Sequence, residues 1–146
     1  MNDIEVSEMT LSDLEEIKHT LSENFDDLWS YSVFKSELSS IHSKYIVIKQ
    51  HGNIIGFAGM QIILDEGNIM NIVTKTENRK LGIASLMLKE LLQIAKKYKL
   101  KLINLEVNEH NLAAIHLYNK FGFKQVGLRK KYYNHTDDAI LMTLNI

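Results

Sequence analysis

Three groups between positions 79 and 118 have residue types and spacing that could carry out group-transfer chemistry. The first is an R-x-x-G-x-A run that opens an amphipathic segment, Arg79-Lys80-Leu81-Gly82-Ile83-Ala84. Backbone N–H groups at the start of a helix bind anions, and a glycine there lets a phosphate approach the main chain closely. The run therefore predicts a pyrophosphate site, although a plain loop before a helix is the simpler interpretation of the same residues.

The second and third groups are a carboxylate and a phenol that follow this run. In the strand expected at 102–107, alternation places Glu106 on the same side as Leu102 and Asn104. Partial burial there would raise the pKa of Glu106 toward the range of a general base, unless the side chain simply reaches solvent or a lysine. Tyr118 lies in the next expected helix, where it either packs or protonates a thiolate leaving group. Together the three groups predict a transferase that uses a cofactor containing pyrophosphate.

The elements that must position these groups follow from hydrophobic periodicity and turn residues. Expected strands cover residues 4–6, 44–50, 54–64, 69–74, 100–107, 123–133 and 139–144, and expected helices cover 11–21, 25–38, 83–98 and 112–121. Thr10 or Ser12 should cap the first helix and Asn111 the last. Turns are expected at 51–53, 65–68 and 134–137, and residues 100–107 read as a strand covered on both faces. The pattern predicts a mixed α/β or α+β fold in which helices pack against one sheet.

Length and composition narrow the class of protein. The chain has 146 residues, which predicts one domain over 1–146, and it contains no cysteine or proline. Disulfides and thiolate chemistry are therefore excluded. We expect a cytoplasmic protein with no membrane role, because no signal peptide or long apolar run is present. The six histidines are not spaced as metal ligands, so no metal site is expected. The sequence also lacks the interleaved basic and aromatic residues that are typical of direct nucleic-acid binding.

Charge is unevenly distributed although the formal net charge is only −1. Residues 1–40 carry ten acidic side chains against two lysines, and residues 75–101 carry eight basic side chains against two acidic ones. The first segment suits a cationic partner and the second an anionic one, unless both are simply solvated helix faces.

Two longer runs resemble the GCN5-related N-acetyltransferase (GNAT) superfamily, namely NIVTKTENRKLGIASLML at 71–88 and LEVNEHNLAAIHLYNKFGF at 105–123. Within it, LEV at 105–107, N-x-x-A-x-x-L-Y at 111–118 and VGLRKKYY with DDAILM at 126–142 are most similar to RimI-type ribosomal-protein alanine N-acetyltransferases. The resemblance implies a mostly antiparallel central sheet flanked by about four helices. It also implies two splayed parallel strands, 69–74 and 101–107, at the cofactor site.

The resemblance further implies the site residues and the reaction, which is direct attack of a primary amine on acetyl-CoA in a ternary complex. Cofactor-binding residues would be Ile72, Val73, Arg79, Lys80, Leu81, Gly82, Ile83, Ala84, Ser85, Asn111 and Tyr118. A backbone N–H near Val73 would polarise the thioester carbonyl. Glu106 would contact the acceptor and act as general base, Tyr118 would be the general acid, and Tyr132 and Tyr133 would line the acceptor site.

Some positions depart from the subgroup, and the acceptor stays open. Asn108 and His110 stand where the subgroup usually has Arg and Ser, and the proline often found before the pyrophosphate turn is missing. The expected acceptor is the N-terminal α-amine of a protein, such as a ribosomal protein. A small amine such as a polyamine or aminoglycoside is the alternative, and a regulatory module that binds acyl-CoA without turnover is a third possibility. The sequence carries no signal for the oligomeric state.

Overall fold

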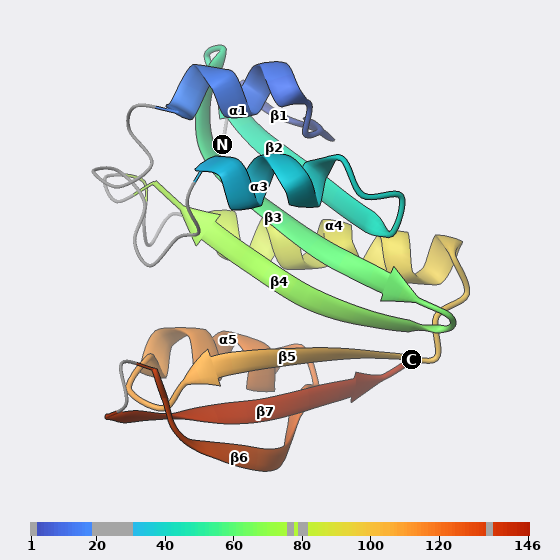
Figure 1. The fold of residues 1–146 in the computed structure, drawn as a ribbon, viewed down its shortest axis with the longest axis vertical. Coiled ribbons are helices and arrows are strands. Elements are labelled where there is room, and N and C mark those ends of the chain that lie inside the picture. Colours follow the sequence, from blue (N-terminus) through green and yellow to red (C-terminus); the bar gives the residue numbers. More distant parts are fainter. Residues whose placement is uncertain (1–2, 19–30, 76–77, 79–81, 134–135) are drawn as a thin grey trace.

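A single mixed sheet forms the centre of the computed structural model, which describes residues 3–18, 31–75, 78, 82–133 and 136–146. Its seven strands are ordered β1-β2-β3-β4-β5-β7-β6 (Figure 1). The strands are β1 (Ile4–Glu8), β2 (Ser43–Gln50), β3 (Asn53–Ile63), β4 (Glu66–Thr74), β5 (Leu102–Asn108), β6 (Lys124–Tyr133) and β7 (Asp137–Asn145), and the helices are α1 (Leu11–Ile17), α3 (Tyr31–Leu38), α4 (Ile83–Lys97) and α5 (Leu112–Lys120). The expected order of elements and the mostly antiparallel sheet are confirmed over this part of the chain.

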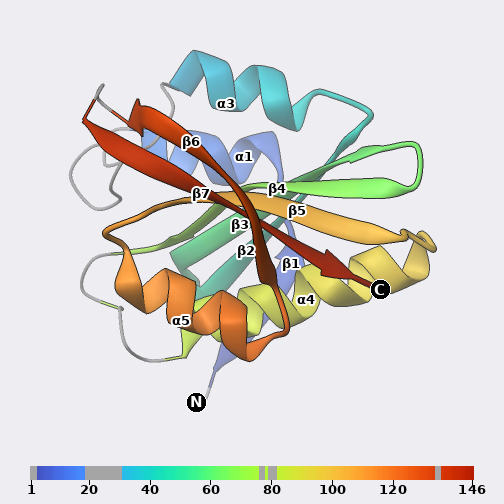
Figure 2. The same cartoon turned by 90° about the horizontal axis from the view of Figure 1, so that it is seen from below.

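Helices cover the two faces of the sheet in pairs (Figure 2). On one face, α1 and α3 pack on β2 and β3 through an apolar cluster that includes Leu14, Phe34 and Phe57. On the other face, α4 and α5 enclose the larger cluster, whose fully buried members include Met87 and Ile103. Within the described ranges, no helix is long and apolar enough to cross a membrane.

Helix starts are set by local chemistry where the sequence offers a capping side chain. Thr10 caps α1, because its hydroxyl accepts from the Asp13 N–H while the Asp13 carboxylate accepts from the Thr10 N–H at 2.8 Å. Asn111 caps α5 by accepting from the Ala114 N–H at 3.2 Å. Both caps were expected. Residues 19–30, which contain parts of two expected helices, lie outside the described residues.

Both expected hairpin turns are present, but the second has different bounds. His51 and Gly52 form the β2–β3 turn with φ of 52° and 80°. The β3–β4 turn lies at Leu64-Asp65 and not at 65–68, because β4 already begins at Glu66 and Leu64 supplies the positive φ of 56°. Gly67 serves close packing rather than a turn: a Cβ there would lie 2.7 Å from the Met60 sulfur.

Strands β4 and β5 run parallel but stay together over only three pairs, Glu66–Leu102, Gly67–Ile103 and Asn68–Asn104. Beyond Asn68, the register of β4 on β3 skips Met70, which is therefore the extra residue of a β-bulge. The two strands then diverge toward the end that faces the start of α4 (Figures 1 and 2). The expected splay of parallel strands is thus confirmed, and its onset coincides with the bulge.

Strand β5 differs from its expected form in one respect. Ile103, Leu105 and Val107 are buried in the cluster under α4 and α5, whereas Glu106 is exposed on the opposite face. The expectation of a strand covered on both faces is therefore wrong. The apolar run spans one buried face and one face that carries polar side chains, because alternate residues of a strand point to opposite sides.

Candidate active site

The start of helix α4 presents main-chain N–H groups of the kind that can bind an anion. Gly82 is the N-cap with φ of 80°, and among the described residues no side chain caps the helix and no atom lies within 4 Å of where a Cβ would stand. The helical ladder begins with the Leu86 N–H bonded to the Gly82 carbonyl at 3.1 Å. The N–H groups at 83–85 precede that ladder, so they point outward at the positive end of a helix dipole. Arg79, Lys80 and Leu81 lie outside the described residues.

The edge of β4 that faces β5 beyond the bulge carries main-chain groups in a defined order. The Lys75 N–H donates to the Ile55 carbonyl of β3 at 2.8 Å. Because alternate residues of an antiparallel strand direct their N–H groups to the same side, the Val73 N–H also faces β3. The N–H groups of Ile72 and Thr74 face the side on which β5 has moved away.

A buried tyrosine braces this bulge from the neighbouring strands. Tyr45 of β2 lies across Gly59 of β3, where a Cβ would come within 2.1 Å of its ring. The Asn71 side chain, next to bulge residue Met70, donates to the Tyr45 hydroxyl at 3.0 Å. Burial raises the pKa of Tyr45 well above its usual range, so the hydroxyl stays protonated. Sequence reasoning missed this contact, which depends on three strands being in register.

Glu106 is paired on the polar face of β5. One of its carboxylate oxygens lies 3.2 Å from Nη2 of Arg129, with the two side chains 31% and 55% exposed. The guanidinium of Arg129 also lies over the Tyr132 ring, 5.4 Å from its centroid. Arg129 belongs to the VGLRKKYY run noted in the sequence, but nothing in that run indicated that it would face Glu106.

Tyr118 lies on α5 and is buried in the cluster on the opposite face of the sheet from Glu106. Its ring packs against Phe123 at a centroid distance of 5.9 Å and an angle of 60°. The two expected proton-transfer residues thus approach β5 from opposite sides. Any substrate atom that both can reach must lie near the gap between β4 and β5.

The two tyrosines expected at the acceptor site lie at the end of β6. Tyr132 is half exposed beneath Arg129. Tyr133 pairs through its backbone with Asp137, and its side chain lies outside the described part of the protein. Lys131 between Arg129 and Tyr133 adopts a φ of 53°, and the strand register shifts there. The positive φ and the register shift mark an irregularity in β6 directly before Tyr132.

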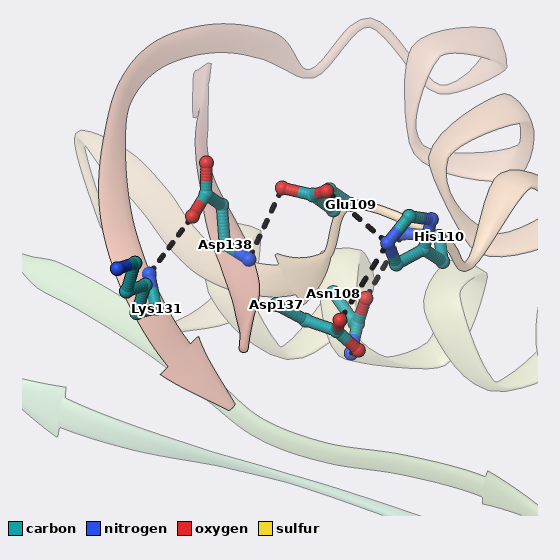
Figure 3. Close-up of polar contacts among 6 residues, drawn as sticks. All are labelled: Asn108, Glu109, His110, Lys131, Asp137 and Asp138. Atoms are coloured by element: carbon teal, nitrogen blue, oxygen red, sulfur yellow. Dashed lines mark hydrogen bonds and ion pairs between the residues drawn. The ribbon is translucent and has the colours of Figure 1, made fainter. Parts of the chain in front are cut away.

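A polar network connects the loop after Glu106 with the hairpin after Arg129 (Figure 3). The Lys131 N–H at the irregularity donates to Asp138 at 2.8 Å, and the Asp138 N–H donates to Glu109 at 3.1 Å. His110 Nε2 lies 3.2 Å from Glu109 and 3.6 Å from Asp137. These contacts join the β5–α5 loop to the β6–β7 hairpin, and the two segments flank the Glu106–Arg129 pair.

The positions that depart from the subgroup pattern are part of this network. Asn108 donates from its side chain to Asp137 at 3.1 Å and accepts the His110 N–H at 2.9 Å. Asn108 and His110 therefore fasten the β5–α5 loop to β7. No group of His, Asp and Glu side chains in the described ranges is suited to hold a metal ion.

Comparisons with known proteins agree with this geometry. The model of the acetyltransferase (GNAT) family matches residues 10–123. The ribosomal protein bS18-alanine N-acetyltransferase of Escherichia coli is 31% identical over 144 residues, which cover 97% of this chain and 97% of that protein. The N-alpha-acetyltransferase RimI of Mycobacterium tuberculosis is 34% identical over 112 residues, covering 74% of this chain and 69% of that protein. The crystal structure of the E. coli enzyme superimposes with a TM-score of 0.90 at 28% identity, covering 98% and 94% of the two chains.

Proposed function

Because this chain belongs to the acetyltransferase (GNAT) family and transfers acetyl groups from acetyl-CoA to an amine, we propose that its acceptor is the N-terminal α-amine of a protein. The observation that carries the proposal is the similarity to the E. coli bS18-alanine enzyme along 97% of both chains. That span includes β6 and β7, which carry Arg129, Tyr132 and the network on the acceptor side. A ribosomal protein that begins with alanine is the first choice of acceptor.

The start of α4 supports a pyrophosphate-binding role for the residues expected there. The N–H groups of Ile83, Ala84 and Ser85 would donate to phosphate oxygens, and Gly82 leaves the approach open. Arg79 and Lys80 would add positive charge, and the Leu81 amide would contribute a further donor. Asn111 uses its side-chain oxygen to cap α5, and its NH₂ group would donate to the cofactor arm.

The diverging edge of β4 supports a role in orienting the thioester. Bound acetyl-CoA supplies an activated acetyl group. The N–H groups of Ile72 and Thr74 point toward the gap, so we assign to them the polarisation of the thioester carbonyl. Val73, whose N–H faces β3, would contribute through its position between these two donors.

The proton transfers follow from the placement of the carboxylate and the phenol. Glu106 would accept one proton from the acceptor ammonium, directly or through a water molecule, which leaves a neutral amine. The amine nitrogen then bonds to the carbonyl carbon while the carbon–sulfur bond breaks. Tyr118 would give its hydroxyl proton to the departing sulfur, and the second proton that the nitrogen loses as the amide forms would return to the Tyr118 oxygen. Tyr132 and Tyr133 would line the path along which the peptide N-terminus reaches Glu106.

The acceptor is tested by following thiol release from acetyl-CoA with three compounds. These are a basic peptide that starts with alanine, the same peptide with its N-terminus already acetylated, and spermidine. The proposal expects much faster turnover with the free peptide than with spermidine and none with the acetylated peptide, and mass spectrometry should find the acetyl group on the first residue. Turnover with spermidine and not with the peptide would replace the proposal by a small-amine acceptor. Binding of CoA without turnover of any amine would indicate a regulatory module.

A further inference from the structure

Arg129 occupies the position at Glu106 that an acceptor ammonium would need. Its Nη2 lies 3.2 Å from the Glu106 carboxylate. The contact spans β7, since Glu106 of β5 is opposite Leu141 and Arg129 of β6 is opposite Ala139. Two cations cannot share one carboxylate without repelling each other, so a bound acceptor must change this contact.

The pair can rearrange at little cost because it is exposed to solvent on both sides. Ion pairs between exposed side chains contribute about 0–1 kcal/mol to stability. A guanidinium also has five N–H donors in a planar fork, and one carboxylate oxygen cannot use all of them. Tyr132 beneath the guanidinium keeps the fork near Glu106 if the carboxylate turns toward an acceptor.

We propose that Arg129 is a specificity-determining residue that selects an amine with an adjacent amide carbonyl, which is the chemistry of a peptide N-terminus. Arg129 neutralises Glu106, so a simple ammonium ion gains little attraction at this site. When the acceptor ammonium binds Glu106, the guanidinium of Arg129 loses part of its contact with that carboxylate. A peptide replaces the lost contact, because its first carbonyl accepts a hydrogen bond from Arg129. A polyamine has no such carbonyl, so it displaces Arg129 without offering the guanidinium a new partner.

This inference rests on the proposed function, and the chain offers a matched control for testing it. Lys130 is the next residue of β6, is exposed, and has no ion pair among the described residues. Lys130→Gln removes the same charge as Arg129→Gln from the same strand. Arg129→Lys keeps the charge and removes the planar fork.

The experiment measures kcat and KM at saturating acetyl-CoA for the four proteins with an alanine-starting peptide and with spermidine. In Arg129→Gln, we expect the peptide-to-spermidine ratio of kcat/KM to fall about tenfold or more, mainly through the peptide KM, as for a lost hydrogen bond to a charged group. Arg129→Lys should recover part of the ratio, and Lys130→Gln should match wild type. CoA binding measured by calorimetry checks that each variant is folded, and Arg129→Lys carries the test if the Gln variant is not.

A second acceptor tests the contribution of the first peptide carbonyl separately. A peptide with a thioamide at its first peptide bond keeps the shape of the peptide but accepts hydrogen bonds more weakly. It should be a poorer acceptor than the normal peptide for wild type and an equal one for Arg129→Gln. An unchanged ratio in Arg129→Gln, or the same thioamide effect in both proteins, would overturn the inference and leave Arg129 as a structural ion pair. Failure of wild type to use any peptide would instead overturn the proposed function.

Discussion

The carboxylate of Glu106 and the ring of Tyr118 lie on opposite sides of strand β5. Glu106 points to the face that carries Arg129, and Tyr118 is buried with Leu105 and Val107 under α5. A continuous sheet would separate the two groups. Strand β4 separates from β5 after the Asn68–Asn104 pair, so the proposed roles of the two groups require the substrate to lie in this gap.

Removing the base should slow chemistry without affecting cofactor binding. Glu106→Gln keeps the shape of the side chain and cannot accept the acceptor proton, so kcat should fall about 10²–10⁴-fold near neutral pH. The deficit should shrink at high pH, where free amine is abundant. Steady-state kinetics and CoA calorimetry measure the two effects. Glu66→Gln, an exposed carboxylate at the start of β4, is the control, and wild-type turnover in Glu106→Gln would move the base elsewhere.

Removing the phenolic hydroxyl tests the acid. Tyr118→Phe keeps the ring that packs on Phe123, so CoA affinity should change only modestly. If thiolate protonation limits turnover, kcat should fall about tenfold or more. Tyr98→Phe, at a half-exposed tyrosine after α4, should have no effect. Equal thiol release by Tyr118→Phe and wild type would leave Tyr118 with a packing role alone.

Two glycines with the same positive φ provide a matched test of the pyrophosphate site. Gly82 and Gly52 both have φ of 80°, and at both positions no atom of the described residues lies within 4 Å of where a Cβ would stand. Valine at either position carries a similar backbone penalty of about 1–2 kcal/mol, visible as a lower Tm. Gly82→Val alone should weaken CoA binding by about tenfold or more, which calorimetry measures. Equal CoA affinity in the two variants would contradict the site at the start of α4.

The Asp13–Lys49 ion pair predicts part of the acid sensitivity of stability. Burial raises the pKa of Asp13, whereas the hydrogen bond from the Thr10 N–H and the contacts with Lys49 and the Thr10 hydroxyl lower it. The lowering contacts together outweigh burial, so the pKa of Asp13 lies below its usual value. The ionised carboxylate therefore stabilises the fold above its unfolded pKa of about 3.9, and this contribution is lost as the pH falls through the folded pKa.

Urea unfolding at pH 6 and pH 3 measures this contribution. Asp13→Asn should reduce the difference in unfolding free energy between the two pH values. Asp65→Asn should leave it nearly unchanged, because the Asp65 side chain is 46% exposed against 9% for Asp13, although its pair with Lys101 is a similar 3.2 Å long. Equal pH dependence of Asp13→Asn and wild type would assign the acid sensitivity to other groups.

The brace of the β4 bulge should affect activity as well as stability. Tyr45→Phe removes the hydroxyl that accepts from Asn71 and leaves the ring in place, so the Ile72 and Thr74 N–H groups should be held less firmly. We expect a lower kcat with a stability loss of about 1 kcal/mol. Gly59→Ala places a Cβ in the ring of Tyr45 and should cost about 1–3 kcal/mol. A Tyr45→Phe variant with full kcat would limit the brace to a structural role.

Local patterns in the sequence predicted most of the fold. The caps Thr10 and Asn111, the His51-Gly52 turn and the helical period of α4 depend on neighbouring residues, and all are found. The bounds of the turn expected at 65–68 were wrong because Gly67 allows close packing against Met60, and a glycine is as compatible with close packing as with a turn. Glu106 could be singled out as a polar residue in an apolar strand. Its partner Arg129 could not, because their contact requires β7 to lie between the two strands.

The insertion of β7 also orders events during synthesis. Strand β7 follows β6 in the chain but lies between β5 and β6 in the sheet. A nascent chain that has emerged only through β6 therefore has no neighbour on which β6 can pair, while β1 to β4 and α4 can already assemble. The pyrophosphate site proposed at the start of α4 can therefore form before the proposed acceptor side, which is complete only once β7 has joined β5 and β6.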